Sequence, residues 1–405
     1  MTPSFRGPRV VPRSLGAAEP AEDTVALQRA DTAYHSVGLT AEEKKTFVAR
    51  DTADFWGATI QGDIGRVRAH REVTIRTVIL VVALVRKRRA TARVWKAVFG
   101  LVVYVSLYAR PALSFLDVVF HEDDAFEPGV VFIPSRRALA ELAVWLAFVQ
   151  FMSVDLRSPV DTRVFATDAS SRTCAAVVTR LPADLCREIW RQRPRRGVGQ
   201  RYAGEAAFRV ADEEDLASVD ESGDESEAAE AERERASWAS ELCEAVGWQP
   251  VFQYSLRRCE HIVTKEARPI CTLVRSLAAE EREGGLRVID FADYSPNIGA
   301  WAKGRSSSGR LKRHLRQVAP DMLLTDLQLA VPLVRSRANP SDAPTRGRAV
   351  RRLPLAGAPS VLAAALLSCS FNEDTYAAFA ASVEQSASLA ELLEPVTGSP
   401  YVSSG

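Results

Sequence analysis

Four acidic residues stand where a small α/β domain would place the ends of its strands and the start of a helix. They are Asp168, Glu266, Asp293 and Asp342. Three or four carboxylates that converge from different elements can hold two divalent ions roughly 3.5–4 Å apart, which is the inventory for phosphodiester hydrolysis. The pattern is therefore compatible with a catalytic site that takes Mg²⁺ or Mn²⁺ as its cofactor, two ions if active, with these four acids as candidate ligands, although their spacing alone favours ordinary surface carboxylates.

A simpler interpretation of the same acids stays open. Surface carboxylates at strand ends are common, and Asp342 in the turn Asn339-Pro340-Ser341-Asp342 reads by itself as a helix N-cap. The two interpretations differ in geometry. Oxygens of Asp168, Glu266 and Asp293 more than about 8 Å apart could not share ions at ligand distances of roughly 2.0–2.6 Å.

The elements that must position these acids follow from the hydrophobic periodicity after residue 158. The order is a strand, its hairpin partner, a third strand, a helix, a fourth strand, two helices and a last strand, which is typical of an α/β layer domain. Asp168 ends the first strand, Glu266 is expected in the first turn of the helix, and Asp293 follows the fourth strand. The expected ranges are 163–168, 174–179, 252–256, 265–279, 286–291, a helix that contains 299–303, then 310–318 and 327–333.

The rest of the chain divides into regions of different pattern. Residues 31–70 contain two short strands, 55–60 and 66–68, joined by a glycine-containing turn. Residues 71–157 read as long amphipathic helices that break at Pro111 and around 123–134. Residues 1–30 and the acidic insert 212–235 read as disordered, and the tail 351–405 as helical or disordered. The α/β domain is thus expected over 158–350, with the acidic insert looping out of it.

Charge and cysteine content narrow the class of partner. The chain has 52 Lys and Arg against 51 Asp and Glu, yet twelve acids and two arginines fall within 212–235, so the remainder carries about +11. That favours a polyanion partner, although the excess of Arg over Lys also fits a coding bias. Six scattered cysteines and no signal-peptide or bilayer-length apolar run predict an intracellular protein, cytoplasmic or nuclear.

Several short motifs resemble one family. ATDAS (166–170), HIVTKE (261–266), D-x9-KGRSSS (293–308) and SRANPSDAPTR (336–346) are similar to the ribonuclease-H-like segment of reverse transcriptases from DIRS-type retrotransposons, including divergent protist-like copies. Upstream, ADFWGATIQGDIGRVRA (53–69) resembles the end of the palm of such polymerases. LAELAVWLAFVQFMSVDLRSP (139–159) resembles their thumb and connection.

The resemblance implies a ribonuclease-H-like mixed sheet with flanking helices, preceded by a mostly helical thumb-like and connection-like region. It implies that Asp168, Glu266, Asp293 and Asp342 correspond to the metal-binding acids of that fold, and that the partner is an RNA–DNA hybrid. It also places a loop along the nucleic-acid path, for which a flexible solvated linker is the alternative. The residues of that loop are Lys303, Arg305, Ser306, Ser307 and Ser308.

Departures from the family pattern limit the expected activity. The Tyr-x-Asp-Asp hairpin of the polymerase site is absent, so no polymerase activity is expected, and the chain looks like the carboxyl-terminal part of a longer element protein. The 98 positions between Asp168 and Glu266 exceed what a compact domain needs, and Pro296 closely follows Asp293. Three hypotheses follow: a hybrid-specific ribonuclease, a catalytically inactive nucleic-acid-binding or scaffold protein from a decayed copy, or a product without a selected role.

Overall fold

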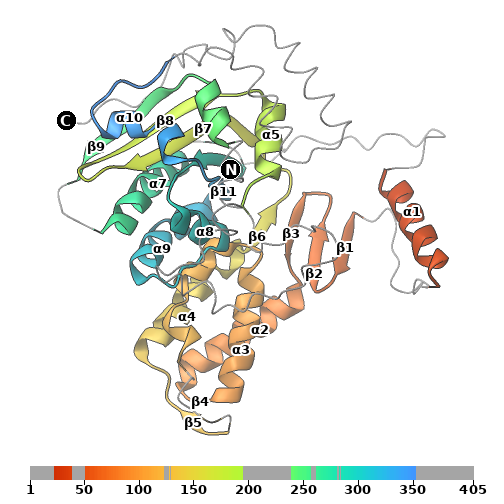
Figure 1. Ribbon diagram of the computed structural model, residues 1–405. Coiled ribbons are helices and arrows are strands. Elements are labelled where there is room, and N and C mark those ends of the chain that lie inside the picture. The colour runs from red at the N-terminus through yellow and green to blue at the C-terminus, as the bar shows by residue number, and fades with distance from the viewer. Residues whose placement is uncertain are drawn as a thin grey trace, which may run out of the picture.

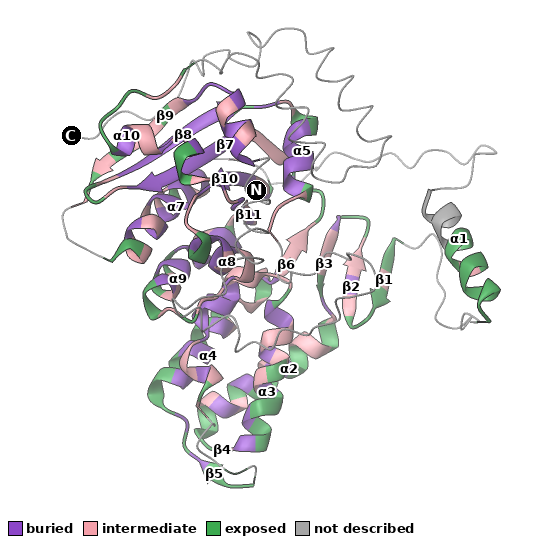
Figure 2. Cartoon of the chain, in the orientation of Figure 1, coloured by how far each residue is buried: buried purple, intermediate pink, exposed green. Residues whose placement is uncertain are grey.

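The computed structural model describes residues 22–38, 51–122, 127, 129–194, 239–256, 261–280, 282 and 284–352. Three predictions concern residues outside these ranges: disorder in 1–21, disorder in the acidic insert 212–235, and a helical or disordered tail beyond 352. Helix α1 (Glu22–Ser36) overlaps the end of the stretch 1–30, where the sequence from Thr24 onwards also favours a helix. This helix stands apart from the body, and nearly all of its described side chains are exposed (Figure 2).

The largest element is a mixed sheet of five strands in the order β11-β10-β7-β8-β9. The central strand β7 pairs antiparallel with β8, which pairs antiparallel with β9, whereas β10 lies parallel to both β7 and β11. The mixed α/β fold predicted from the sequence is confirmed at this level. The strands are β7 (Val160–Ala169), β8 (Thr173–Arg180), β9 (Gln249–Ser255), β10 (Leu286–Phe291) and β11 (Leu327–Ala330).

Helices cover both faces of this sheet (Figure 1). On one face, α5 (Ala183–Arg191) and helical residues 239–245 pack over alternate side chains of β7 such as Val164 and Ala166. On the other face lie α7 (Ile262–Ala278), α8 (Ser295–Lys303) and α9 (Gly309–Leu324), packed over Phe165. The second half of β7 is therefore buried on both sides, and apart from Thr167 and Asp168 its residues are apolar.

The helical region below the sheet has its own core. Trp95 and Trp145 are fully buried, and the Trp145 Nε1 donates a hydrogen bond to Ser106 Oγ at 2.9 Å. Pro111 lies in the first turn of η2, where its missing N–H costs nothing, so the predicted break is confirmed. The elements are α2 (Arg71–Lys87), β4 (Ala90–Thr91), α3 (Ala92–Ser106), η2 (Arg110–Phe115), η3 (Val118–Phe120), β5 (Val131–Phe132), α4 (Arg136–Phe148) and η4 (Val149–Phe151).

A second sheet differs from its prediction. The run 55–60 was expected to be one strand, but Trp56 and Gly57 both have positive φ and form a tight turn between two strands. In addition, residues 153–155, expected within the helical region, form a strand that pairs with 66–68. The sheet order is β1-β2-β3-β6, from β1 (Thr52–Phe55), β2 (Ala58–Gln61), β3 (Arg66–Ala69) and β6 (Ser153–Asp155).

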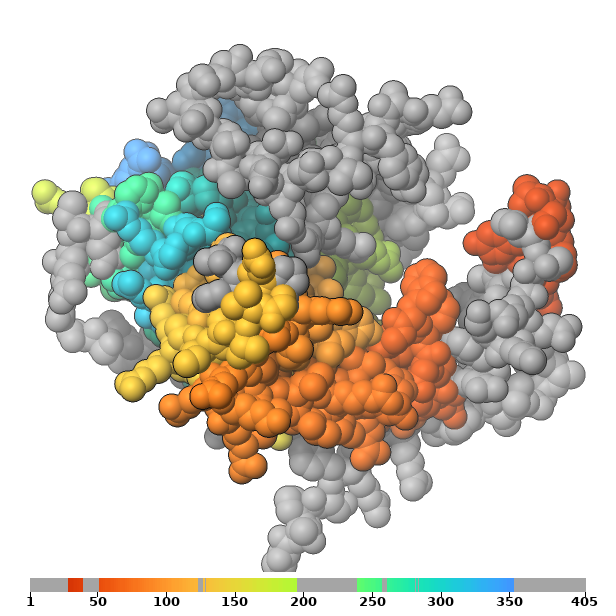
Figure 3. Space-filling view, turned by 90° about the horizontal axis from the view of Figure 1, so that it is seen from below, coloured from red at the N-terminus to blue at the C-terminus, as the bar shows by residue number. Residues whose placement is uncertain are grey.

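Helix α9 joins the sheet domain to the helical region. Ala319 and Leu323 of α9 belong to the core of the helical region, while Leu311 and Leu315 pack under the sheet. Seen from below, residues of α9 lie against the helical region (Figure 3). At the start of this junction Gly304 has a φ of +70°, and a Cβ there would lie 2.1 Å from the Arg110 carbonyl oxygen. Among the described helices, none combines the length and apolar character that crossing a bilayer requires.

Candidate metal centre

Asp168 is the second-last residue of the central strand. It lies opposite Ala175 of β8 and is only 6% exposed, because helices close over both faces of β7 at this end. Thr345 Oγ1 donates a hydrogen bond to Asp168 Oδ2 at 2.7 Å. The carboxylate thus leaves a buried strand with one of its oxygens held by a hydroxyl from α10 (Asp342–Thr345).

Glu266 reaches the same end of the sheet from α7. The helix begins at Ile262, and the His261 side chain caps it by accepting a hydrogen bond from the Val263 N–H, as expected for a capping histidine. The prediction of a first-turn glutamate is therefore wrong: Glu266 lies in the second turn. Its neighbour Lys265 donates from Nζ to the Ser171 carbonyl at 3.0 Å and ties this turn of α7 to the β7–β8 hairpin.

Asp293 follows β10 after one intervening residue. Since β10 runs parallel to β7, the carboxyl ends of both strands meet at the same edge, which brings Asp293 towards Asp168. Ser336 Oγ donates to Asp293 Oδ2 at 2.6 Å. Pro296 is accommodated in the first turn of α8, so it does not displace the preceding aspartate.

The three carboxylates form one cluster. One oxygen each of Asp168, Glu266 and Asp293 lies within 4.8 Å of the others. Two oxygens that share one divalent ion at roughly 2.0–2.6 Å lie no more than about 4–5 Å apart, so the spacing matches that of ligands around an ion. The cluster draws on a strand, a helix and a strand end, and its donor set is all oxygen, which suits Mg²⁺ or Mn²⁺.

Electrostatics within the cluster oppose simultaneous ionisation. Burial, and then the charges of Asp168 and Asp293, raise the pKa of Glu266 to about 9. Burial, with added repulsion from Asp293 and Asp342, raises the pKa of Asp168 to about 6, although the Thr345 hydrogen bond works the other way. Like charges held this close are relieved either by taking up a proton or by binding a cation.

Asp342 lies near this cluster but outside the group of three. Its carboxylate accepts hydrogen bonds from Arg346 Nε at 2.6 Å and from Arg348 at 2.7 Å. Asp342 is the first residue of α10, and Ser341 is the residue that precedes the helix, so the N-cap interpretation is wrong. Of the four acids singled out by the sequence, the structure brings three together and pairs the fourth with arginines.

The loop 303–308 is built into the fold, unlike the flexible linker weighed as its alternative. Ser308 caps α9 by accepting from the Leu311 N–H, and Ser306 Oγ accepts from the Ser308 N–H at 3.1 Å. The guanidinium of Arg305 lies 5.3 Å from the Phe120 ring centroid. Lys303 ends α8, and Ser307 is exposed. Their predicted role in nucleic-acid binding stays a prediction.

Sequence reasoning missed the hydroxyl and amide groups that support the cluster. The Asn339 side chain donates to the Thr167 carbonyl at 3.1 Å, and Ser341 donates from Oγ to the Ala166 carbonyl. Together with Ser336 and Thr345, these residues fasten the segment 336–345 to the ends of β7 and β10. The signal was present in the motif SRANPSDAPTR, where only the aspartate was singled out.

The fold and site define a mixed α/β protein with a carboxylate cluster where β7 and β10 end. No protein-family model matches this chain, and no curated protein is similar to it. Among solved structures, a foamy viral protease-reverse transcriptase in complex with RNA/DNA hybrid is similar with a TM-score of 0.25 and 10% identity, over 80% of this chain and 56% of that chain. The chain thus spans little more than half the length of that solved chain.

Proposed function

We propose that residues 158–350 form a ribonuclease-H-like domain that hydrolyses the RNA strand of RNA–DNA hybrids with two Mg²⁺ or Mn²⁺ ions. The observation that carries the proposal is the cluster of Asp168, Glu266 and Asp293, whose oxygens lie within 4.8 Å of one another although the residues come from three separate elements. The mixed sheet and its flanking helices agree with the layout that the family resemblance implies.

In this proposal each acid has a defined task. Asp168, on the buried central strand, is the fixed ligand, and Thr345 orients it. Asp293 is held by Ser336, and Glu266 is positioned by the tether between Lys265 and the hairpin. When bound, the ions supply an activated water and stabilise the departing 3′ oxygen. The protein groups hold the carboxylates convergent, and bound cations would favour their ionised forms.

Asp342 is proposed as a fourth ligand that exchanges its arginine partners for an ion. Its carboxylate is already close enough to raise the pKa of Asp168, and both arginines that hold it are mostly exposed. The loop with Lys303, Arg305 and the serines 306–308 is proposed to contact the sugar-phosphate backbone. Hydroxyls and guanidinium groups are suitable phosphate partners.

Manganese titration and hybrid cleavage test the proposal together. The purified full chain should bind Mn²⁺ and cut a labelled RNA–DNA hybrid, and Asp168→Asn should weaken the binding of Mn²⁺ by roughly 100-fold and abolish cleavage. Asp184→Asn is the matched control, because it removes one carboxylate charge from the exposed surface of α5. This control should bind Mn²⁺ and cleave like the unsubstituted chain.

A second candidate function is a catalytically inactive nucleic-acid-binding or scaffold protein. The observation that favours it is the pairing of Asp342 with Arg346 and Arg348, which leaves three acids in the cluster. Binding of the hybrid without cleavage, in either metal, would support this candidate and reject the nuclease. Cleavage that persists in Asp168→Asn would reject the assigned site.

A further inference from the structure

A cavity of about 570 Å³ lies where α9, the start of α7 and the helical region meet. Its walls come from three parts of the chain: Ser308 to Arg316 on α9 and its cap, His261 and Val263 at the start of α7, and Asp117 with Arg137 from the helical region. These parts are far apart in the sequence. The cavity therefore exists only because α9 is packed against the helical region.

The lining of this cavity is strongly cationic. Five cationic side chains face it against a single carboxylate, that of Asp117. The five are Arg137, Arg310, Lys312, Arg313 and Arg316. Such an excess of one sign around a concave surface raises the local concentration of anions.

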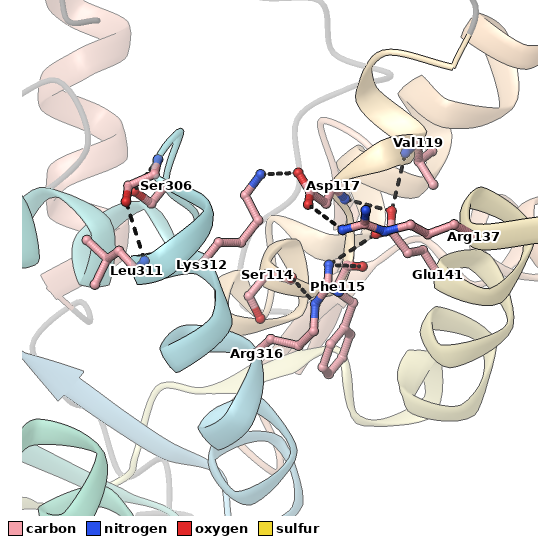
Figure 4. A network of polar contacts seen from close by, with 11 residues as sticks. Ser114, Phe115, Asp117, Val119, Arg137, Glu141, Ser306, Leu311, Lys312 and Arg316 are labelled. Carbon is pink, nitrogen blue, oxygen red and sulfur yellow. Dashed lines mark hydrogen bonds and ion pairs between the residues drawn. The ribbon is translucent and has the colours of Figure 1, made fainter. Parts of the chain in front are cut away.

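Three of the five cations are held in place by acids (Figure 4). Lys312 pairs with Asp117, which also faces Arg137 at 3.4 Å, and Arg316 pairs with the buried Glu141 at 3.1 Å. Burial raises the pKa of Asp117, but the hydrogen bond and charge of Lys312 with the charges of the arginines outweigh it, so the pKa is lowered. Asp117 is thus an ionised carboxylate that partly neutralises the charges of Lys312 and Arg137 in the cavity lining.

The other two cations are available to a ligand. Arg310 and Arg313 are exposed, lie one turn apart on α9, and form no ion pair with any residue that the structure describes. The first turn of α9, with Gly309 in the wall, adds the positive end of a helix dipole to the same cavity. The two arginines and the N-terminal turn of α9 thus line the same cavity.

The cavity adjoins the carboxylate cluster along one helix. Val263 lines the cavity, and Glu266 of the cluster is three residues further on, a rise of about 4.5 Å along α7. Residues at this spacing are neighbours on a helix surface. A nucleic-acid strand carries one phosphate per about 3.4 Å of axis, so a strand bound at the cluster would reach the cavity within a few nucleotides.

We infer that this cavity binds successive phosphates of a nucleic-acid strand through Arg310 and Arg313, with Asp117 as a competing anion. This inference rests on the proposed function and adds to it the place where the sugar-phosphate backbone of the same substrate would bind. Two exposed arginines one helical turn apart can contact two successive phosphates of a strand. The volume is far larger than one phosphate ion needs, and Val263 in its wall is three residues from Glu266 of the carboxylate cluster.

The test measures binding of a labelled RNA–DNA hybrid to the full chain without divalent metal, as a function of salt. The double variant Arg310→Gln/Arg313→Gln should bind about 10- to 100-fold more weakly near 0.1 M salt, with the slope of log K against log salt reduced by about 2. Asp117→Asn, which removes the competing anion, should bind more tightly. Arg187→Gln removes one positive charge on the opposite face of the sheet and should bind as the unsubstituted chain does.

Each result decides the matter separately from cleavage. Unchanged hybrid affinity and salt slope in the double variant, or weaker binding in Asp117→Asn, would overturn the inference. The inference would also be overturned if inorganic phosphate displaced the hybrid at a concentration equal to that of the hybrid's phosphates, because the cavity would then be a site for a free ion. If the nuclease proposal fails but the arginine dependence holds, the cavity stands as a nucleic-acid site. Manganese affinity should be the same in the double variant and the unsubstituted chain.

Discussion

Carboxylates occur in two contrasting settings in this molecule. Asp117 and Glu141 each face cations from the same chain, and the pKa of Asp117 is lowered. Asp168 and Glu266 face other carboxylates at the end of the sheet, and their pKa values are raised. Acids of the first kind are satisfied by folding alone, whereas acids of the second kind need a proton or an external cation. The difference separates structural ion pairs from a candidate binding site by their electrostatics.

The largest effect expected from this comparison is a change in the pH dependence of stability at Glu266. Its folded-state pKa of about 9 is above the ordinary value of 4.5, so its contribution to stability is present below pH 4.5 and is lost as pH rises towards 9. Without divalent metal, Glu266→Gln should therefore raise the free energy of unfolding at pH 8 by a few kcal/mol and change it little at pH 4. Urea unfolding in chelator at both pH values measures this.

The paired acid should show the opposite sign. The folded-state pKa of Asp117 is lowered, so its contribution is present above the ordinary pKa of 3.8 and is lost as pH falls through the folded value. Asp117→Asn should then lower the free energy of unfolding at pH 8. Equal signs for the two variants at pH 8 would contradict the distinction between the two settings.

A somewhat smaller effect is expected from the buried pair of the helical region. Arg316→Gln leaves the carboxylate of Glu141, which is 5% exposed, without its cation, although the backbone N–H groups of Asp117 and Val119 still donate to it. The free energy of unfolding should fall by roughly 2–4 kcal/mol. Arg313→Gln on the exposed side of the same helix should change it by less than about 0.5 kcal/mol. Similar losses in both variants would show that helix propensity, and not the pair, is responsible.

The smallest effect is expected at Thr345. Thr345→Val keeps the shape of the side chain but removes the hydroxyl that donates to Asp168, at a cost of about 1 kcal/mol in stability. Since this hydrogen bond lowers the pKa of Asp168, the variant should raise that pKa and shift manganese binding to higher pH. Ser336→Ala removes the corresponding hydroxyl from Asp293 and serves as the comparison. A manganese pH profile identical to that of the unsubstituted chain would rule out an orienting role for Thr345.

Much of the sheet domain could be predicted from the sequence, because its strands and helices follow clear periodicity. The hairpin of β7 and β8 and the helix after β9 lie where the alternation and the 3.6-residue period place them. The turn at Trp56 was missed because positive φ at a tryptophan has no sequence signal. The pairing of β6 with β3 was missed because it joins residues more than eighty positions apart.

The candidate site was predictable to a similar extent. Acids at strand ends pointed to Asp168 and Asp293, and parallel pairing explains why they meet. The arginine partners of Asp342 were not foreseen, since side-chain pairing depends on rotamers that a sequence pattern does not specify. The basic cavity could not be predicted from the sequence for a related reason. Asp117 and Arg313 line the same cavity only because α9 packs against the helical region.

Gly304 limits which residues can stand where the sheet domain packs against the helical region. The turn after α8 touches the Arg110 carbonyl so closely that the smallest side chain, a methyl group, would collide with main-chain atoms on the other side. Arg110 in turn donates to the Ala302 carbonyl at 3.2 Å. An alanine at position 304 would therefore clash with Arg110 unless the helical region moved away from the turn between α8 and α9. The close packing of the helical region against the turn after α8 thus depends on a hydrogen atom in place of a side chain.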